Sequence, residues 1–268
     1  MAIRTRKSGD LVYLIDENIP VPHAFTTRLG GVSEGSYHSL NPHPHVGDDP
    51  AAVSENVERI LAVLGGDKAQ VVFSRQIHTD HIRVVGASDC LTDIHHPLTQ
   101  EADGLITIEP DVTLAVFTAD CIPILLWDAY TGAVAALHAG WRSTVLDIAG
   151  KAVEKLCAMA SYPKYIRASI GPGIGMCCFE TDSDVPEAMF ETLGADVVEC
   201  IKDLGSGKSR VDLKEVNRRL LLGARLLPEH ITVSDYCTMC NPDLFWSHRV
   251  TGDKRGAQAA IIRRGEAY

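Results

Sequence analysis

The chain has 268 residues, of which 46% are hydrophobic, so it is long enough to bury a substantial core. Its 25 basic and 35 acidic residues give a formal net charge of -10, which argues against general affinity for nucleic-acid backbones or anionic lipid surfaces. We therefore expect small-molecule partners, with no nucleic acid and no membrane.

The N-terminal segment does not resemble a secretory signal, because Asp10, Asp16 and Glu17 interrupt it before an apolar core can develop. No stretch approaches the roughly 20 consecutive apolar residues of a membrane-spanning helix. These features predict a cytoplasmic protein. Its eight cysteines are too sparse for a disulfide scaffold, so reduced thiols or metal ligands are expected.

The first clear element is a helix that follows Asp49. Asp49 suits the N-cap, Pro50 suits the first turn, the apolar residues that follow have helical spacing, and Gly65 ends the pattern. After this helix, the run VVFSRQIH predicts a strand over residues 71–78 that ends in His78.

Three β-favouring runs come next, and the second and third flank a short turn, which predicts a hairpin. A long helix is predicted over residues 141–160. Further strands are expected at residues 165–171, 197–201, 231–236 and 257–264, and further helices at residues 184–194 and 212–226. This mixture predicts an α/β or α+β layered sandwich with a mixed sheet, formed by one domain over residues 1–268.

The hairpin brings a thiol and an imidazole to the same end of the sheet. If its loop is Asp128 to Thr131, Cys121 lies opposite His138; a loop one residue longer places Ile122 there instead. Side chains alternate between faces, so the register decides whether the two groups converge. The sequence leaves both registers open.

Cys121 and His138 suit two chemistries, a nucleophilic Cys-His pair or a metal site. His78 is the best third ligand, since it also ends a predicted strand, and Gln76 beside it is placed to orient a neighbour or the substrate. Three protein ligands with a fourth position open are typical of catalytic zinc. Asp120, next to Cys121, costs several kcal/mol if buried without a partner, which suggests a role in the site.

Two further patterns are weaker. In HAGWR, Gly140 permits close backbone approach, and Arg142 opens a helix whose first amides favour an anion. Cys237 and Cys240 form a CxxC pair, for which Cys177 and Cys178 are candidate partners in a structural zinc site. That motif is incomplete, because its second pair is adjacent in sequence.

Several motifs together resemble one known family. They are, in order, TRLGGVSEGSYHSLN, HVGDDPAAVSEN, ADGLIT, TADCIPILL, HAGWR, IGPGIGMCCFE and DLKEVN. The chain thereby resembles the family once named multicopper polyphenol oxidase or laccase-like, now regarded as purine nucleoside phosphorylases. The ordered set spans nearly the whole chain.

The resemblance implies a single-domain mixed α/β fold that is sometimes grouped with cysteine hydrolases of the bacterial toxin type. It also implies one zinc ion bound by His78, Cys121 and His138. The implied activity is phosphorolysis of adenosine, inosine, guanosine and methylthioadenosine to a base and a sugar 1-phosphate, with deamination of adenosine as a second activity. Purine nucleosides and phosphate are then the partners of a monomer or small homo-oligomer.

The resemblance marks Arg28 as an anion-binding or catalytic residue, and a guanidinium binds phosphate well. We expect Cys121, Asp120 and Arg28 to take part in catalysis. Substrate contacts are expected from Arg28, from Asn41 at the end of the same motif, and from Gln76 and Arg142.

The C-terminal run FWSHRVTGDKRG departs from the FFSYRR-like pattern of the family. His248 replaces the Tyr, Val250 replaces the second Arg, and extra residues precede Arg255. Two other functions stay open. One is a Cys-dependent amidase or peptidase acting on cell-wall precursors; the other is a copper-dependent polyphenol oxidase, since one copper ion also suits His-Cys-His ligation.

Overall fold

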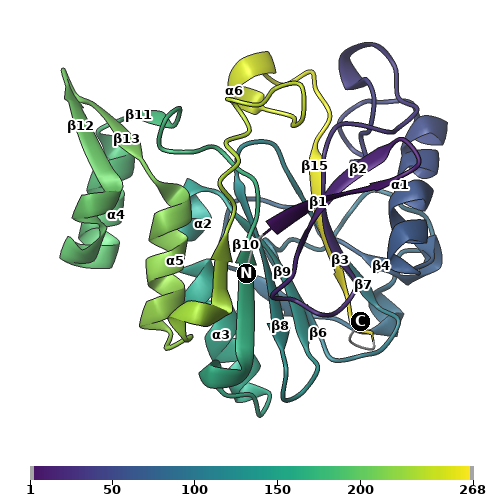
Figure 1. Cartoon of the computed structure of the whole chain (residues 1–268), viewed down its shortest axis with the longest axis horizontal. Coiled ribbons are helices and arrows are strands. Elements are labelled where there is room, and N and C mark those ends of the chain that lie inside the picture. The colour runs from purple at the N-terminus through teal and green to yellow at the C-terminus, as the bar shows by residue number, and fades with distance from the viewer. Residues whose placement is uncertain (1–2, 266–268) are drawn as a thin grey trace.

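Two six-stranded mixed sheets form the centre of the molecule, a computed structural model that describes residues 3–265 (Figure 1). The first sheet has, in spatial order, β1 (Ile3–Ser8), β2 (Leu11–Asp16), β3 (His23–Thr26), β15 (Gln258–Arg263), β7 (Thr113–Thr118) and β4 (Val71–Val72). The second has β14 (Ile231–Val233), β10 (Ile166–Ile170), β8 (Ile122–Asp128), β9 (Val134–Ala139), β6 (Gly104–Thr107) and β5 (Ile82–Val84). A small third sheet has β11 (Glu180–Asp182), β13 (Lys208–Val211) and β12 (Ile201–Gly205).

The helices among residues 3–265 are α1 (Pro50–Leu64), α2 (Trp141–Val145), α3 (Ile148–Ala158), α4 (Asp184–Leu193), α5 (Leu213–Gly223) and α6 (His248–Thr251). In Figure 1, α1 lies on one side of the sheets, and α2, α3 and α5 lie on the other. No helix among residues 3–265 combines the length and the apolar character needed to cross a membrane.

Period-two alternation along the strands builds two of the cores. In β7, Ala115 and Phe117 pack with α1, whereas Leu114 and Val116 face the second sheet. A third core lies between the second sheet and its helices. The layer order is therefore helix, sheet, sheet, helix, and the predicted mixed α/β class is confirmed. The predicted single domain also includes residues 1–2 and 266–268, which lie outside the described residues.

Local signals placed α1 correctly. The Asp49 carboxylate accepts from the backbone N–H groups of Ala51 and Ala52, and Pro50 occupies the first turn. Gly65 ends the helix in a left-handed conformation, with a φ of 64°. Residues 141–160 instead form two helices, because Asp147 adopts a φ of 56° and its side chain caps α3 at the Gly150 N–H.

The β8–β9 hairpin forms in neither of the registers considered from the sequence. Pro123 lies opposite His138, because the Asp128 carboxylate accepts from the backbone N–H groups of Tyr130 and Thr131 and stabilises a longer loop. The shift from the first register is two residues, which preserves the face on which each side chain lies. Cys121, just before β8, therefore still lies on the His138 face.

Two predicted strands are wrong. In residues 71–78, only Val71–Val72 form a strand, since the backbone N–H groups of residues 77–79 are bound by the Asp103 carboxylate rather than by a neighbouring strand. Residues 197–200 instead form the end of a 3-10 helix, Gly194–Cys200, and only Ile201 belongs to a strand, as the first residue of β12. Val197 and Cys200 are both buried, and their spacing of three matches one turn of such a helix.

Candidate metal centre and its cleft

His78, Cys121 and His138 converge at one end of the sheets, which settles the question that the hairpin left open from the sequence. His78 comes from the loop after β4, Cys121 from the turn that crosses from β7 to β8, and His138 from β9. Their ligand atoms lie within 4.8 Å of one another, and Cys121 Sγ is 3.8 Å from His78 Nε2. We call these three residues the His-Cys-His centre.

The donor set and the space around it fit one metal ion. A thiol and two imidazoles suit zinc or copper. Gly140 provides the space, because a Cβ there would lie 2.7 Å from His78 Cδ2 and 3.1 Å from Cys121 Sγ. Its φ of -66° is ordinary, so the glycine is required for room and not for conformation.

The buried carboxylate of Asp103 orients two of the three ligands. It lies 2.7 Å from His138 Nδ1, and since a carboxylate only accepts, Nδ1 carries the proton and Nε2 is left as the ligand atom. It also accepts from the backbone N–H of His78 at 3.0 Å and from Thr79 at 2.8 Å. These bonds fix His78 at a φ of 62°, a region that few non-glycine residues adopt.

Sequence reasoning gave Asp103 no role, although it lies in the ADGLIT motif that carries part of the family resemblance. It could have been noticed because it is a charged residue at the start of an apolar strand, which is the feature that drew attention to Asp120. The Asp103 carboxyl is fully buried, which raises its pKa, but the bond and charge of His138 together with the backbone N–H groups of Thr79 and Ile77 outweigh this effect, so the pKa falls below its ordinary value.

Asp120 holds the cleft wall together. Its carboxylate accepts from Thr238 Oγ1 at 2.6 Å, from Ser247 Oγ at 3.0 Å and from the Arg249 backbone N–H at 2.7 Å. The polarity of Asp120 is thus explained by three donors from the C-terminal region, at a residue whose φ of 90° is itself unusual. A catalytic role for Asp120 stays a prediction.

Cys121 and His138 form a thiolate and imidazolium pair when no metal is bound. Burial opposes ionisation of the Cys121 thiol, but the charge of His138 and hydrogen bonds from both histidines lower its pKa to about 6. Burial likewise opposes the charge on His138, but Cys121 and Asp103 raise its pKa to about 9. Between these values the two opposite charges stabilise each other.

This pairing predicts a pH profile for alkylation of the chelator-treated protein by iodoacetamide. Since only the thiolate reacts, labelling of Cys121 should rise as the pH increases through about 6. Cys90 is the internal control, because burial and two nearby carboxylates raise its pKa. Mass-spectrometric mapping measures both sites, and a Cys121 midpoint at or above that of Cys90 would contradict the assignment.

A cleft of about 400 Å³ opens beside the His-Cys-His centre. Helix α6, at the top of Figure 1, forms part of its rim. Besides the three ligands, its walls are formed by His43, Val46, Gln76, Phe117, Thr118, Ala119, Asp120, Trp141, Ile174, Phe179, Leu213, His248, Arg249, Asp253, Arg255 and Ala257. The volume is in the range of small-molecule sites.

The predicted substrate-binding residues lie in different surroundings. Gln76 lines the cleft, but its amide is bonded to both the N–H and the C=O of Phe117. Asn41 is buried and bonds to Asp48 and to the backbone N–H of Ala257. Arg142 lies over the Trp141 ring, 4.2 Å from its centroid, and is outside the set that lines the cleft. Substrate contacts by these residues stay predictions.

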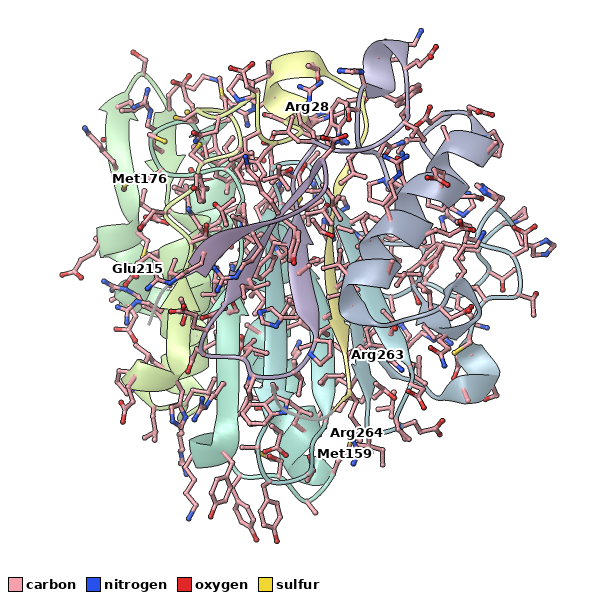
Figure 2. The ribbon with its side chains drawn as sticks, turned by 45° about the vertical axis from the view of Figure 1, so that its right-hand side comes forward. Arg28, Met159, Met176, Glu215, Arg263 and Arg264 are labelled. Carbon is pink, nitrogen blue, oxygen red and sulfur yellow. The ribbon has the colours of Figure 1, made fainter. Side chains whose placement is uncertain are left out.

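Arg28 also lies outside the lining set, at the same end of the molecule as α6 (Figure 2). Its guanidinium donates to the carbonyls of Pro242 and His38 at 2.8 and 2.9 Å, and it stacks 4.0 Å above the Trp246 ring. In this structure Arg28 therefore ties the N-terminal loop to the C-terminal segment, and its role toward an anion stays a prediction.

Arg249 and Arg255, both in the divergent C-terminal run, line the cleft. Arg249 donates to the Glu180 carbonyl, whereas Arg255 has an unused donor. Arg255 Nη1 donates to the Gly256 carbonyl at 2.9 Å, and its buried Nε has no hydrogen-bond partner among the described residues.

Burial lowers the pKa of Arg255, and the negative charges of Asp120, Cys121 and Asp253 oppose that shift. A half-buried guanidinium with an unused donor is suited to bind an anion.

Fold and site together define a mixed α/β protein with a candidate metal centre open to a cleft. A sequence model of the family described as multi-copper polyphenol oxidoreductase laccase matches residues 22–265. The chain belongs to this family, as its motifs predict.

Characterised relatives carry two kinds of name. Purine nucleoside phosphorylase YlmD of Bacillus subtilis is 35% identical over 254 residues, which cover 93% of this chain and 91% of that protein. Adenosine deaminase RL5, from an unknown prokaryotic organism, is 33% identical over 246 residues, which cover 90% and 93%. The crystal structure of YlmD from Geobacillus stearothermophilus superposes with a TM-score of 0.91 at 34% identity, over 97% of this chain and 98% of that one.

Proposed function

We propose that the protein is a zinc-dependent purine nucleoside phosphorylase that cleaves adenosine, inosine, guanosine and methylthioadenosine. The observation that carries this proposal is the cleft itself, which is lined both by the His-Cys-His centre and by Arg255 with its unused donor. The names of the relatives support the substrate class.

In this reaction a phosphate oxygen bonds to the anomeric carbon of the sugar while the bond from that carbon to the purine nitrogen breaks. The departing base takes up a proton. Arg255 would bind and orient the phosphate, since a guanidinium matches two phosphate oxygens. Phe117 and His43, whose ring centroids lie 4.5 Å apart, would offer an aromatic surface to the purine.

His43 contributes to that surface as a neutral ring. Burial, followed by the charges of His45, Arg255 and His138, lowers its pKa to about 3. The ring therefore adds no charge that would compete with Arg255 for the phosphate. Zinc bound by His78, Cys121 and His138 would supply a Lewis acid beside the substrate.

Arg255 and Arg28 make a matched pair of variants. We expect Arg255→Lys to raise KM for phosphate by about 10- to 100-fold, because the ammonium cannot replace two directed bonds to one anion. Arg28→Lys should change KM for phosphate by less than about threefold, because its guanidinium already bonds to two carbonyls. Steady-state kinetics at saturating inosine measure both; a large phosphate effect at Arg28 and none at Arg255 would reverse the assignment.

Deamination of adenosine is proposed as a second activity, on the strength of the resemblance and the relative named for it. The two activities give different products from adenosine: phosphorolysis yields adenine and deamination yields inosine. Chromatography with and without phosphate separates them. Adenine that requires phosphate, together with inosine that does not, is the expected pattern.

One rival has a specific observation in its favour. Cys121, His138 and Asp103 also have the order of a nucleophile, a base and an orienting carboxylate, and the Cys121 pKa is already low. A Cys-dependent hydrolase would be labelled quickly at Cys121 by iodoacetamide even when loaded with metal. A phosphorylase whose thiolate is a ligand should be labelled only after chelation.

The direct test of the proposal is incubation of the purified protein with inosine and phosphate. Equal amounts of hypoxanthine and ribose 1-phosphate are expected, with neither product when phosphate is omitted. Absence of both products in the complete mixture, from protein with one metal ion at the His-Cys-His centre, would reject the proposal.

A further inference from the structure

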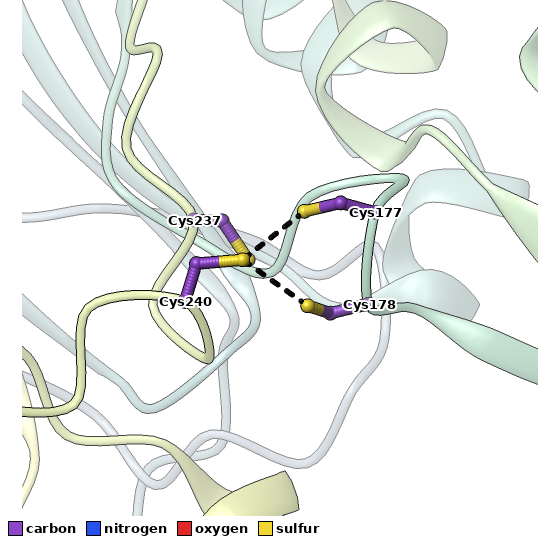
Figure 3. Close-up of side chains that lie close together, drawn as sticks. All are labelled: Cys177, Cys178, Cys237 and Cys240. Carbon is purple, nitrogen blue, oxygen red and sulfur yellow. Dashed lines mark hydrogen bonds between the residues drawn. The ribbon is translucent and has the colours of Figure 1, made fainter.

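Cys177, Cys178, Cys237 and Cys240 bring their sulfur atoms together outside the cleft (Figure 3). All four Sγ atoms lie within 4.8 Å of one another. Cys240 Sγ is 3.4 Å from Cys177 Sγ and 3.3 Å from Cys178 Sγ, and all four are free cysteines. We call this group the four-cysteine cluster.

The local backbone explains how an adjacent pair can supply two converging thiols. In an extended strand, neighbouring side chains point to opposite faces. Residues 176–178 instead form a turn, closed by bonds from the N–H groups of Cys178 and Phe179 to the Gly175 carbonyl. Both sulfur atoms consequently face Cys240, as Figure 3 shows. The sequence argued against a zinc site because Cys177 and Cys178 are adjacent and not spaced by two residues. The turn removes that objection.

The partner pair is held by a second turn. The backbone N–H and the side-chain amide of Asn241 both donate to the Cys237 carbonyl. The Gly175 N–H donates to Cys237 Sγ at 3.2 Å. Backbone N–H groups aimed at a sulfur stabilise a thiolate, and such outer bonds are typical of metal ligands.

We infer that the four-cysteine cluster binds one zinc ion with a structural role, in addition to the metal at the His-Cys-His centre. Four sulfur donors in a tetrahedral arrangement are typical of zinc. With zinc–sulfur bonds of about 2.3 Å, the sulfur atoms of such a site lie about 3.8 Å apart, close to the spacing here. The body of an iron–sulfur cluster would hold the thiolates farther apart.

The ion would join the two loops that support Asp120. Gly173 and Cys237 are bridged, and the Thr238 N–H donates to the Gly173 carbonyl. From these loops, the Ile174 N–H donates to the Asp120 carbonyl at 2.8 Å and Thr238 Oγ1 donates to its carboxylate at 2.6 Å. Zinc at the four-cysteine cluster would thus stabilise the wall of the cleft without contacting substrate.

The test is the number of zinc ions per chain, measured by native mass spectrometry on untagged, reduced protein after zinc loading and dialysis. Wild type should carry two. Cys240→Ser and His78→Ala should carry one each, and the double variant none. Cys157→Ser is the matched control, since Cys157 is free and lies outside both groups, and it should keep two.

Two results would overturn the inference. One is a wild type with a single zinc that His78→Ala removes, together with four reactive thiols at the cluster. The other is a mass of the wild type, purified without reductant, that is lower by two hydrogen atoms per cystine, which would assign the cluster to disulfides. If Cys240→Ser does not fold, Cys178→Ser and the thiol-to-cobalt absorption of cobalt-loaded wild type and His78→Ala provide the same comparison.

Discussion

Cys121→Ser should lower the rate of inosine phosphorolysis by more than about 100-fold. Loss of a hydrogen-bond partner behind a metal ligand costs about 10- to 100-fold, so loss of the ligand itself should exceed that range. Cys121 is the thiolate of the centre, and a serine hydroxyl stays protonated near neutral pH. Steady-state rates and metal content of the purified variant are the measurements.

Cys157→Ser again provides the control, because it removes a thiol of α3 that lies outside both the His-Cys-His centre and the four-cysteine cluster. It should keep wild-type kinetics and metal content. If Cys121→Ser kept more than a tenth of the wild-type rate, the thiolate would not be needed as a ligand, and the account of the centre would fail.

Asp103→Asn should reduce metal affinity at the centre by about 10- to 100-fold. The amide nitrogen that replaces one carboxylate oxygen is a donor, so it must face either His138 Nδ1–H and the His78 N–H, which share Oδ1, or the N–H groups of residues 77 and 79, which share Oδ2. Each choice leaves buried donors unpaired and misdirects a ligand. Competition with a chromogenic chelator measures the affinity.

Asp128→Asn is the matched control for that variant. Asp128 is also fully buried, and it also accepts from successive backbone N–H groups, those of Tyr130 and Thr131, but at the opposite end of the β8–β9 hairpin. Both variants should lower the free energy of unfolding, whereas only Asp103→Asn should weaken metal binding. Equal losses of metal affinity would show a general effect of destabilisation.

The elements that could be predicted from sequence are those fixed by local interactions. Helix α1 carries its own start and stop signals in Asp49, Pro50 and Gly65. The strands around the centre are predicted by apolar runs in the sequence, and successive side chains along a strand such as β7 lie in different cores, as the period of two requires. The convergence of the three candidate ligands could be suspected for a related reason, since each is a metal-binding side chain in or next to a predicted strand.

The features that were missed depend on contacts between distant residues. His78 leaves the strand conformation because of Asp103, and the hairpin register depends on how the Asp128 side chain closes the loop. Arg255 lines the cleft from a run that the family pattern does not match, so neither the motifs nor a local pattern pointed to it. No local pattern encodes these choices.

The most direct test of the account is reconstitution of the metal-depleted protein with zinc or with copper. The depleted protein, with its fold checked by circular dichroism, should release no hypoxanthine from inosine and phosphate. Zinc should restore phosphate-dependent release, and copper-loaded protein should not oxidise phenols. Full phosphorolysis by the metal-free protein, or oxidation of phenols with no cleavage of inosine, would contradict the central claim that the His-Cys-His centre serves a zinc-dependent phosphorylase.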